Sequence, residues 1–327
     1  MTDAAASPSD AAPSLAALRD AAAALVGVAY RTPLVPVTGH GLFGSHELRI
    51  KAECCQRIGA FKIRGAYTAL ARLDPAVRRR GVVAFSSGNH AQGVACAAQL
   101  FGVPAVIVMP RSTAALKVAG VRRYGGEVVF AGATRSPEQA ATAQRLAAER
   151  GAALIPPYDH PDVILGQGTC ALEILDDFPM VQTLLVPASG GGLLAGSCAA
   201  VLATGAAVEV VAVEPAGAAK ISAAFAHGRP VSVGEVNTIA DGLLTPQVGD
   251  LTWPIIQRVV RRTITVTDDE IRAAMRWLHE ATTLRLEPSG ATAFAAVLSG
   301  RLPLSGPTAV IASGGNIDPA HFADLTA

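Results

Sequence analysis

Short apolar segments alternate with helical segments between residues 81 and 157. Strands are predicted at residues 82–85, 105–109 and 128–130, and helices at residues 90–100, 114–124 and 137–150. Ser136, Pro137 and Gly151 mark the ends of the last helix as its cap, its first residue and its stop. Such alternation builds parallel sheets that are covered by helices on both faces, so the sequence predicts an α/β fold.

A second set of elements lies on both sides of this block. Strands are predicted at residues 48–52, 184–186, 208–213 and 308–312, and helices after Ser14, at residues 65–73, 168–175, 194–202 and 290–298, and after the capping box at residues 267–270. We therefore expect a small domain at residues 77–157 and a large domain from residues 15–76 and 158–327. Residues 1–14 are small, polar or proline, which predicts a flexible tail.

Composition excludes several classes of protein. A net charge of +1 offers no basic surface for nucleic acid and fits a small neutral or zwitterionic ligand. The start of the chain lacks a signal peptide pattern, and Pro187 and three glycines interrupt the uncharged stretch at residues 178–208, so no membrane span is expected. The five cysteines show no metal-ligand spacing, which predicts reduced thiols in a cytoplasmic protein without zinc.

Three polar loops each follow an apolar strand, where parallel sheets bind their ligands. In the loop at residues 186–193, consecutive glycines before a helix let backbone N–H groups converge on a phosphate. The alternative is a tight turn that only packs helix on strand. The loop at residues 86–93 offers hydroxyl, amide and N–H donors suited to a carboxylate, or else a plain helix cap. The third loop, residues 313–316, places Ser313 at a strand end.

A lysine stands between an aromatic residue and nearby glycines in the segment 59–66. Such an environment suits an amine in a tight, desolvated pocket, where the pKa of the ammonium falls and the neutral amine becomes available. The alternative is that Lys62 and Arg64 are the exposed first residues of an ordinary helix. A lysine, a phosphate loop and a carboxylate loop together describe a pyridoxal phosphate site.

From about residue 31 onward, the chain resembles the fold type II threonine and serine dehydratases and the related serine racemases. The motifs that carry the resemblance lie at residues 59–66, 86–93, 166–169, 186–193, 240–242, 287–291 and 313–316. The resemblance implies a fold like that of the tryptophan synthase β subunit, with two open, twisted, mostly parallel sheets and helices on both faces. It also implies pyridoxal 5'-phosphate as cofactor and a homodimer.

The resemblance also implies roles for individual residues. Lys62 would hold the cofactor as a Schiff base and take the substrate's α-proton, and Ser87 is the second catalytic candidate. The remaining cofactor-binding candidates are Phe61, Asn89, Ser189, Gly190, Gly191, Gly192, Leu193, Glu287, Ser313 and Gly314. The substrate carboxylate would be held by Ser86, Ser87, Asn89 and His90.

The expected reaction converts L-threonine or L-serine to a 2-oxo acid and ammonia. Serine racemisation is the first alternative, because the resemblance gives Ser87 the role of a second proton carrier on the opposite side of the cofactor. Three further possibilities are the dehydration of a different β-hydroxy amino acid such as hydroxyaspartate, a β-replacement reaction, and a non-catalytic relative that only binds the cofactor.

One motif departs from the family's pattern. Relatives bind a structural divalent cation at positions that correspond to Glu214, Ala218 and Lys220, and the ammonium of Lys220 would repel such an ion. We therefore expect no metal, and we expect Lys220 to replace the cation by pairing with Glu214. The alternative is that Lys220 points to solvent.

Overall fold

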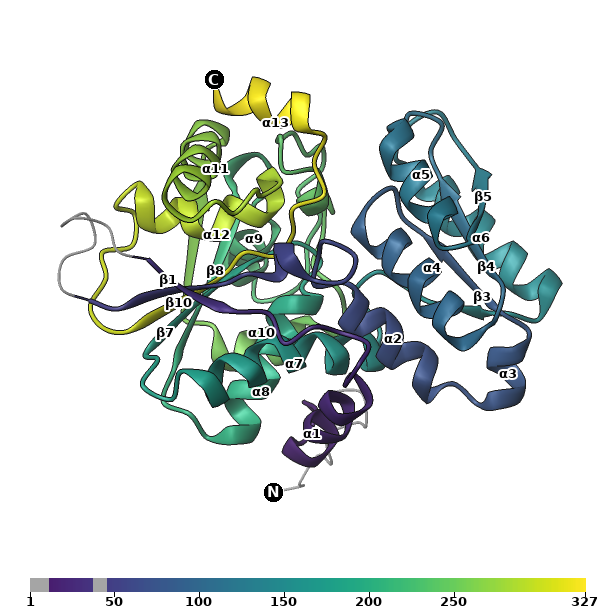
Figure 1. Ribbon diagram of the computed structural model, residues 1–327, viewed down its shortest axis with the longest axis horizontal. Coiled ribbons are helices and arrows are strands. Elements are labelled where there is room, and N and C mark those ends of the chain that lie inside the picture. Colours follow the sequence, from purple (N-terminus) through teal and green to yellow (C-terminus); the bar gives the residue numbers. More distant parts are fainter. Residues whose placement is uncertain (1–11, 38–45) are drawn as a thin grey trace.

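Two sheets organise the residues that the computed structural model describes, 12–37 and 46–327 (Figure 1). The larger sheet has the order β1-β2-β10-β7-β8-β9, and its strands are β1 (Leu34–Val37), β2 (Leu48–Lys51), β10 (Thr308–Ile311), β7 (Thr183–Pro187), β8 (Glu209–Pro215) and β9 (Arg262–Val266). The smaller sheet has the order β5-β4-β3-β6, from β5 (Glu127–Phe130), β4 (Ala105–Met109), β3 (Val82–Phe85) and β6 (Ala153–Leu154). β1 runs antiparallel to β2, and the other described pairs are parallel.

Helices cover both faces of each sheet. They are α1 (Leu15–Ala24), α2 (Ile63–Arg72), α3 (Pro75–Arg79), α4 (Asn89–Phe101), α5 (Ala115–Arg123), α6 (Pro137–Arg150), α7 (Pro161–Asp177), α8 (Gly192–Thr204), α9 (Lys220–His227), α10 (Trp253–Val259), α11 (Asp268–Thr282), α12 (Pro288–Leu298) and α13 (Pro319–Thr326). Three short 3₁₀ helices are η1 (Glu53–Cys55), η2 (Ala216–Ala218) and η3 (Asp241–Leu243). The predicted α/β fold with mostly parallel sheets is confirmed.

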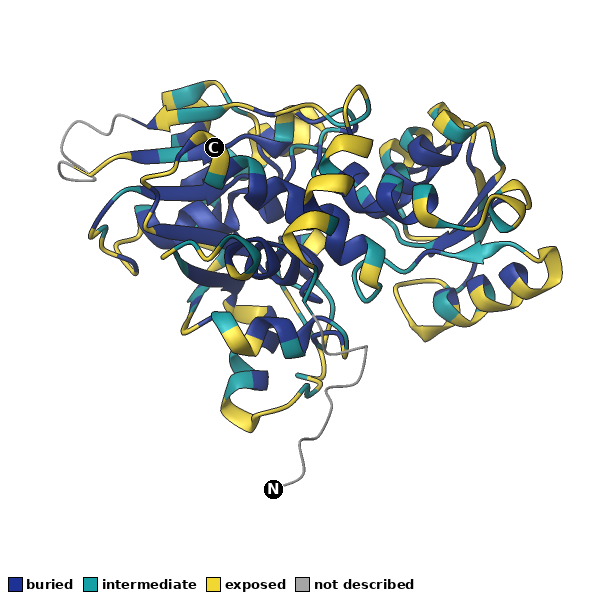
Figure 2. Cartoon of the chain, turned by 90° about the horizontal axis from the view of Figure 1, so that it is seen from below, coloured by how far each residue is buried: buried dark blue, intermediate teal, exposed yellow. Residues whose placement is uncertain are grey.

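Successive side chains of the central strands enter different layers of the core. In β7, Leu184 and Val186 belong to the layer that contains α7 and α8, whereas Leu185 belongs to the layer that contains α11 and α12. In β3, Val83 packs with α6 and its neighbours Val82 and Ala84 pack with α2 and α4. Because both faces are buried, these strands are apolar apart from Thr183 at the start of β7, as expected for parallel sheets. Figure 2 shows the buried residues concentrated on the sheets and on the helix surfaces that meet them.

Several predicted helix ends are confirmed. Ser14 caps α1, the capping box of Ser136 and Gln139 opens α6, and that of Thr267 and Glu270 opens α11. The predicted helix at residues 168–175 begins earlier, because His160 caps α7 and Pro161 is its first residue. The sequence patterns did not predict the short helices α3, α9, α10 and α13, nor the strands β1, β6 and β9 at the sheet edges.

The strands of the smaller sheet all come from residues 82–154, and those of the larger sheet from residues 34–51 and 183–311. The domain boundaries at residues 15, 77 and 158 stay a prediction. Residues 1–11 of the predicted tail lie outside the described residues.

Candidate active site

One pocket collects the loops that follow β3, β7 and β10, together with the segment before α2. Its cavity has a volume of about 240 Å³, just below the range of about 300 to 1,000 Å³ that is usual for small-molecule sites. The predicted site residues that line it are Phe61, Lys62, Ser86, Ser87, Asn89, His90, Ser189, Gly190, Gly191, Gly192, Leu193, Glu287 and Ser313. Residues far apart in the sequence thus meet at the carboxyl ends of strands from both sheets.

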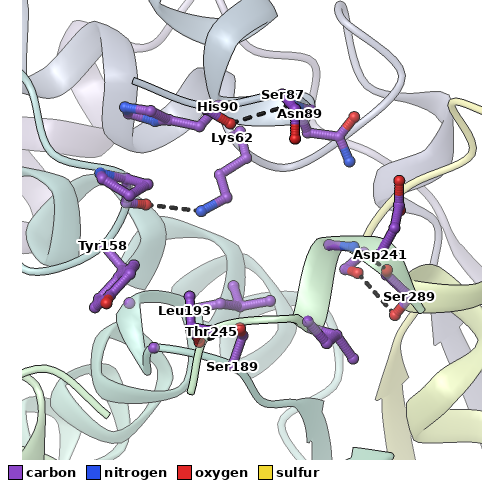
Figure 3. A pocket seen from close by; sticks show the side chains of 18 of the residues that line it. Lys62, Ser87, Asn89, His90, Tyr158, Ser189, Leu193, Asp241, Thr245 and Ser289 are labelled. Carbon is purple, nitrogen blue, oxygen red and sulfur yellow. Dashed lines mark hydrogen bonds between the residues drawn. The ribbon is translucent and has the colours of Figure 1, made fainter. Parts of the chain in front are cut away.

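Lys62 precedes the first residue of α2 and points into this pocket. In Figure 3 its amine lies between the loop that carries Ser87 and Asn89 and the loop that carries Ser189. Nζ donates a hydrogen bond of 2.7 Å to the carbonyl of Pro157. Burial lowers the pKa of Lys62 to about 8. A substantial share of the amine is therefore neutral near physiological pH.

Backbone contacts hold the lysine segment against the third loop. Ala60 forms a β-bridge with Gly314, and the amide of Phe61 donates to the carbonyl of Ser313 at 3.1 Å. Gly314 itself does not line the pocket. A Cβ atom there would stand 2.2 Å from Oε1 of Glu287, so a larger residue would displace the Glu287 carboxyl group.

Arg64 stabilises the start of α2 through buried ion pairs. It is fully buried and forms ion pairs of 2.8 Å with Glu53 and 2.7 Å with Glu173. Lys51 also pairs with Glu173, at 2.6 Å. The alternative in which Lys62 and Arg64 begin an exposed helix is wrong, because this network lies inside the protein. Loss of one partner would leave an uncompensated buried charge.

The glycine loop at residues 186–193 forms a cradle, residues 189–193, at the N-terminus of α8. Gly191 has a φ of +100°, and a Cβ atom there would stand 2.6 Å from Oγ1 of Thr252. A Cβ atom on Gly190 would stand 2.4 Å from the ring of Tyr158. The Ser189 hydroxyl lies 2.6 Å from Oγ1 of Thr245, which adds polar groups to the helix N-terminus. Free N–H groups and the helix dipole make this an anion site.

The serine loop, which consists of residues 86–88, precedes α4 on the opposite side of the pocket (Figure 3). The Ser86 hydroxyl accepts a hydrogen bond of 3.2 Å from the amide of Gly88. The His90 side chain turns away from this loop, and its Nε2 lies 2.9 Å from the carbonyl of Ile155. Burial, with the Lys62 charge as a smaller cause, lowers the pKa of His90 to about 3. The ring is therefore neutral.

Asn89 connects the serine loop to two other segments. Its Nδ2 donates to Oε1 of Glu287 at 2.5 Å, and its Oδ1 accepts from Nδ2 of Asn316 at 2.8 Å. Burial, and secondly the charge of Asp241, raises the pKa of Glu287 to about 8. Glu287 is thus mainly protonated at neutral pH. Ser313, nearly buried, donates to the carbonyl of Ser289 at 3.4 Å.

The pocket also contains residues to which the sequence analysis gave no role. Among them are Lys117, Arg135, Tyr158, Asp241, Thr245 and Ser289. Lys117 forms an ion pair with Asp241, and Nη2 of Arg135 donates to the Ser87 hydroxyl at 3.2 Å. Asp241 and Ser289 lie in the motifs at residues 240–242 and 287–291, so these motifs could have identified them as site residues. The others lie in segments without a motif.

The predicted pair of Lys220 and Glu214 is not formed as an ion pair. Lys220 is fully buried, which excludes the solvent-exposed alternative, but its Nζ donates to the carbonyl of Leu243 at 2.8 Å. The Glu214 carboxylate instead accepts from the amides of Ile221 and Ser222 at the start of α9. Burial lowers the pKa of Lys220 to about 8, and the Glu214 charge opposes that shift.

Residues 12–37 and 46–327 contain neither a metal-binding cluster nor a membrane-spanning helix. No cluster of three or more histidine, cysteine or acidic side chains there could hold a metal ion. None of the described helices is both long and apolar enough to cross a membrane. The absence of a metal stays a prediction.

Comparisons with known proteins agree with this geometry. The family described as "Pyridoxal-phosphate dependent enzyme" matches residues 26–314. The L-threo-3-hydroxyaspartate ammonia-lyase of Saccharomyces cerevisiae is 42% identical over 85% of this chain and 86% of that protein. The L-threonine ammonia-lyase of Thermotoga maritima is 40% identical over 89% and 71% of the two chains. The structure of maize serine racemase has a TM-score of 0.92 and 38% identity, over 96% and 97%.

Proposed function

The chain belongs to the pyridoxal-phosphate-dependent enzyme family, and from this premise we propose that it is an ammonia-lyase of β-hydroxy amino acids. It converts L-threonine or L-serine to a 2-oxo acid and ammonia. The observation that carries the proposal is the position of the Lys62 amine, with its lowered pKa, in one pocket with an anion cradle and a serine loop.

The described residues fit pyridoxal 5'-phosphate. In the cradle at residues 189–193, Cβ atoms on Gly190 and Gly191 would collide with Tyr158 and Thr252. Because both residues are glycines, the loop can take this conformation, and its N–H groups are available to the phosphate. Lys62 supplies an amine for covalent attachment, and Asn89, Glu287 and Ser313 lie around the same cavity for the ring. When bound, the cofactor withdraws electrons from the substrate's α-carbon.

Two groups of residues act on the substrate. The hydroxyls of Ser86 and Ser87 and the N-terminal amides of α4 bind its α-carboxylate. The Lys62 amine, which its lowered pKa keeps partly neutral, would take the α-proton. The β-hydroxyl leaves with a proton as water, and a water molecule then adds to release ammonia and the 2-oxo acid.

Ser313 favours elimination over transamination. At the position that would face the ring nitrogen of the cofactor, it offers a hydroxyl in place of a carboxylate. A hydroxyl there would not hold a proton on that nitrogen as a carboxylate would, so the bound cofactor would withdraw electrons less strongly. Prompt loss of the β-hydroxyl is then favoured over a long-lived carbanion.

Racemisation of serine is the second candidate, and Ser87 supports it. The contact from Arg135 places a positive charge beside the Ser87 hydroxyl and would stabilise its deprotonated form. A hydroxyl that exchanges its proton there could serve the face of the substrate opposite Lys62. Chiral analysis of serine after incubation distinguishes the two candidates, since D-serine forms only if a second proton carrier acts.

The direct test is release of a 2-oxo acid from L-threonine and L-serine by the wild type and by Lys62→Ala. We expect the wild type to release it and the variant to lose at least about a thousandfold in rate, because a nucleophile and general base is removed. Circular dichroism would show that the variant is folded. Activity retained in folded Lys62→Ala would contradict the proposal.

A further inference from the structure

Lys220 is a buried lysine to which the proposed reaction gives no role. It is the first residue of α9, and its side chain is fully buried. Its Nζ donates a hydrogen bond of 2.8 Å to the backbone carbonyl of Leu243, the last residue of η3. Burial of an ammonium costs free energy that an apolar side chain of similar length would not cost. The contact with η3 is therefore the feature of this lysine that needs a function.

The neighbouring carboxylate is bound by other groups. Glu214 lies in β8 and is also fully buried. Its oxygens accept hydrogen bonds from the amide of Ile221 at 2.7 Å, from the amide of Ser222 at 2.9 Å and from the Ser222 hydroxyl at 3.0 Å. These three donors satisfy the carboxylate without the ammonium, so the Lys220 side chain is directed to η3 instead.

The segment that Lys220 contacts forms one wall of the pocket. Gly242, Leu243 and Thr245 all line the cavity. Two residues after Leu243, the Thr245 hydroxyl lies 2.6 Å from Oγ of Ser189, the first residue of the cradle (Figure 3). Leu243 is buried, so its carbonyl needs a donor from inside the protein, and Lys220 supplies it. The side chain of α9 is thus connected to the cradle through η3 and Thr245.

We propose that Lys220 is a positioning residue that holds η3 and Thr245 against the phosphate cradle. It acts through the Leu243 carbonyl and the contact between Thr245 and Ser189, and it does not itself line the pocket. The affinity for pyridoxal 5'-phosphate then depends on a lysine outside the pocket. This inference rests on the proposed position of the phosphate in the cradle.

A role in stability alone gives a different result. Loss of the ammonium would then lower the melting temperature, whereas the folded protein would bind the cofactor as tightly as the wild type. A positioning role lowers the affinity of the folded protein, because η3 is no longer held beside the cradle. Lys220→Met separates the two roles, since methionine fills a similar volume with an apolar, flexible side chain and has no N–H donor.

The first test is titration of pyridoxal 5'-phosphate into the cofactor-free full chain, followed by the absorbance of the bound cofactor below the melting temperature of each variant. In Lys220→Met we expect the Kd to rise at least about tenfold. The matched control is Ser222→Ala, which removes a hydroxyl of the same helix that contacts Glu214. Its Kd should change by less than about threefold. An unchanged Kd in folded Lys220→Met would overturn the proposal.

A double-mutant cycle tests the route through Thr245. Thr245→Val removes the hydroxyl that contacts Ser189 and should raise the Kd by about 3- to 10-fold. If Lys220 acts through Thr245, the double variant should bind within about threefold of Lys220→Met, because the two changes remove one connection. Effects that multiply in full would overturn the proposed route. If Lys220→Met does not fold, an unchanged Kd in Thr245→Val overturns the proposal.

These titrations are independent of the reaction, because they contain no substrate. If the wild type binds the cofactor but releases no 2-oxo acid from any β-hydroxy amino acid, the proposed function fails, and the titrations still decide the role of Lys220. If the wild type releases the 2-oxo acid and Lys220→Met binds the cofactor as tightly as the wild type, only the inference on Lys220 fails.

Discussion

Burial sets the protonation of three side chains around the pocket. The pKa of Lys62 falls to about 8, that of His90 falls to about 3, and that of Glu287 rises to about 8. In each case the largest cause is loss of water, which disfavours the charged form. Each of these groups is therefore neutral to a greater extent than it would be in water, which suits a site that must move a proton.

Glu287 should make stability depend on pH. Its pKa is about 8 in the folded protein and roughly 4.3 in an unfolded chain, so between these values the folded state holds the extra proton. Stability then falls as pH rises through that window. Glu287→Gln stays neutral and should avoid this loss. In the cofactor-free protein, we expect the Tm of the variant to exceed that of the wild type increasingly from pH 5 to 8.

Calorimetry at several pH values measures this effect, with Glu149→Gln on the exposed part of α6 as the control. The change should correspond to an order of a few kcal/mol across the window. If the melting temperatures of Glu287→Gln and the wild type remain parallel from pH 5 to 8, Glu287 is ionised in the folded protein.

At the scale of elements, the helix α8 begins in the phosphate cradle and ends at a glycine of similar conformation. Gly191 has a φ of +100° with Thr252 beside it, whereas Gly205 has a φ of +68° and open space within 4 Å of the place where a methyl group would stand. The two glycines thus share a backbone conformation that strains an L-residue. They differ in whether a methyl group would collide with the cradle.

This pair provides a matched test of the cradle. Gly191→Ala should weaken cofactor affinity by at least about tenfold, because the new methyl group displaces Thr252 or the loop itself. Gly205→Ala should lose about 1 to 2 kcal/mol of stability but keep its cofactor affinity. Absorbance titration of cofactor into each cofactor-free variant measures the difference. Unchanged affinity in Gly191→Ala would show that the phosphate lies elsewhere.

Sequence patterns predicted the parts of the site that are local. A few neighbouring residues are enough to interpret such parts. Examples are three glycines between a strand and a helix, which predict an anion site, and a run of polar residues after a strand, which predicts a ligand-binding loop. Lys62 was identified in this way, together with the loops at residues 86–93 and 186–193. The packing of two sheets then brought these segments to one pocket.

Contacts between distant segments could not be predicted from the sequence. Arg135 and Lys117 enter the pocket only because the smaller sheet faces η3, and neither stands in a motif. The sequence predicts an ion pair between Lys220 and Glu214, because the two residues are close along the chain. In the structure Lys220 begins α9 and reaches Leu243, because helix geometry rather than chain proximity sets its direction.

At the scale of the whole molecule, the pocket draws on both sheets. The serine loop follows β3 of the smaller sheet, and the cradle follows β7 of the larger one. The buried network of Arg64, Glu53 and Glu173 fixes the start of α2, next to Lys62. The relative position of the sheets therefore decides whether amine, phosphate and carboxylate sites face one ligand. The homodimer and the cytoplasmic location stay predictions.

Identification of the lysine that binds the cofactor tests the central claim most directly. The lysines of the chain are Lys51, Lys62, Lys117 and Lys220. Borohydride reduction of the holoenzyme makes the attachment permanent, and tryptic digestion with mass spectrometry then locates it. We predict a pyridoxyl group on the peptide of residues 58–64, at Lys62. A pyridoxyl group on Lys51, Lys117 or Lys220, or on none of the four, would contradict the account.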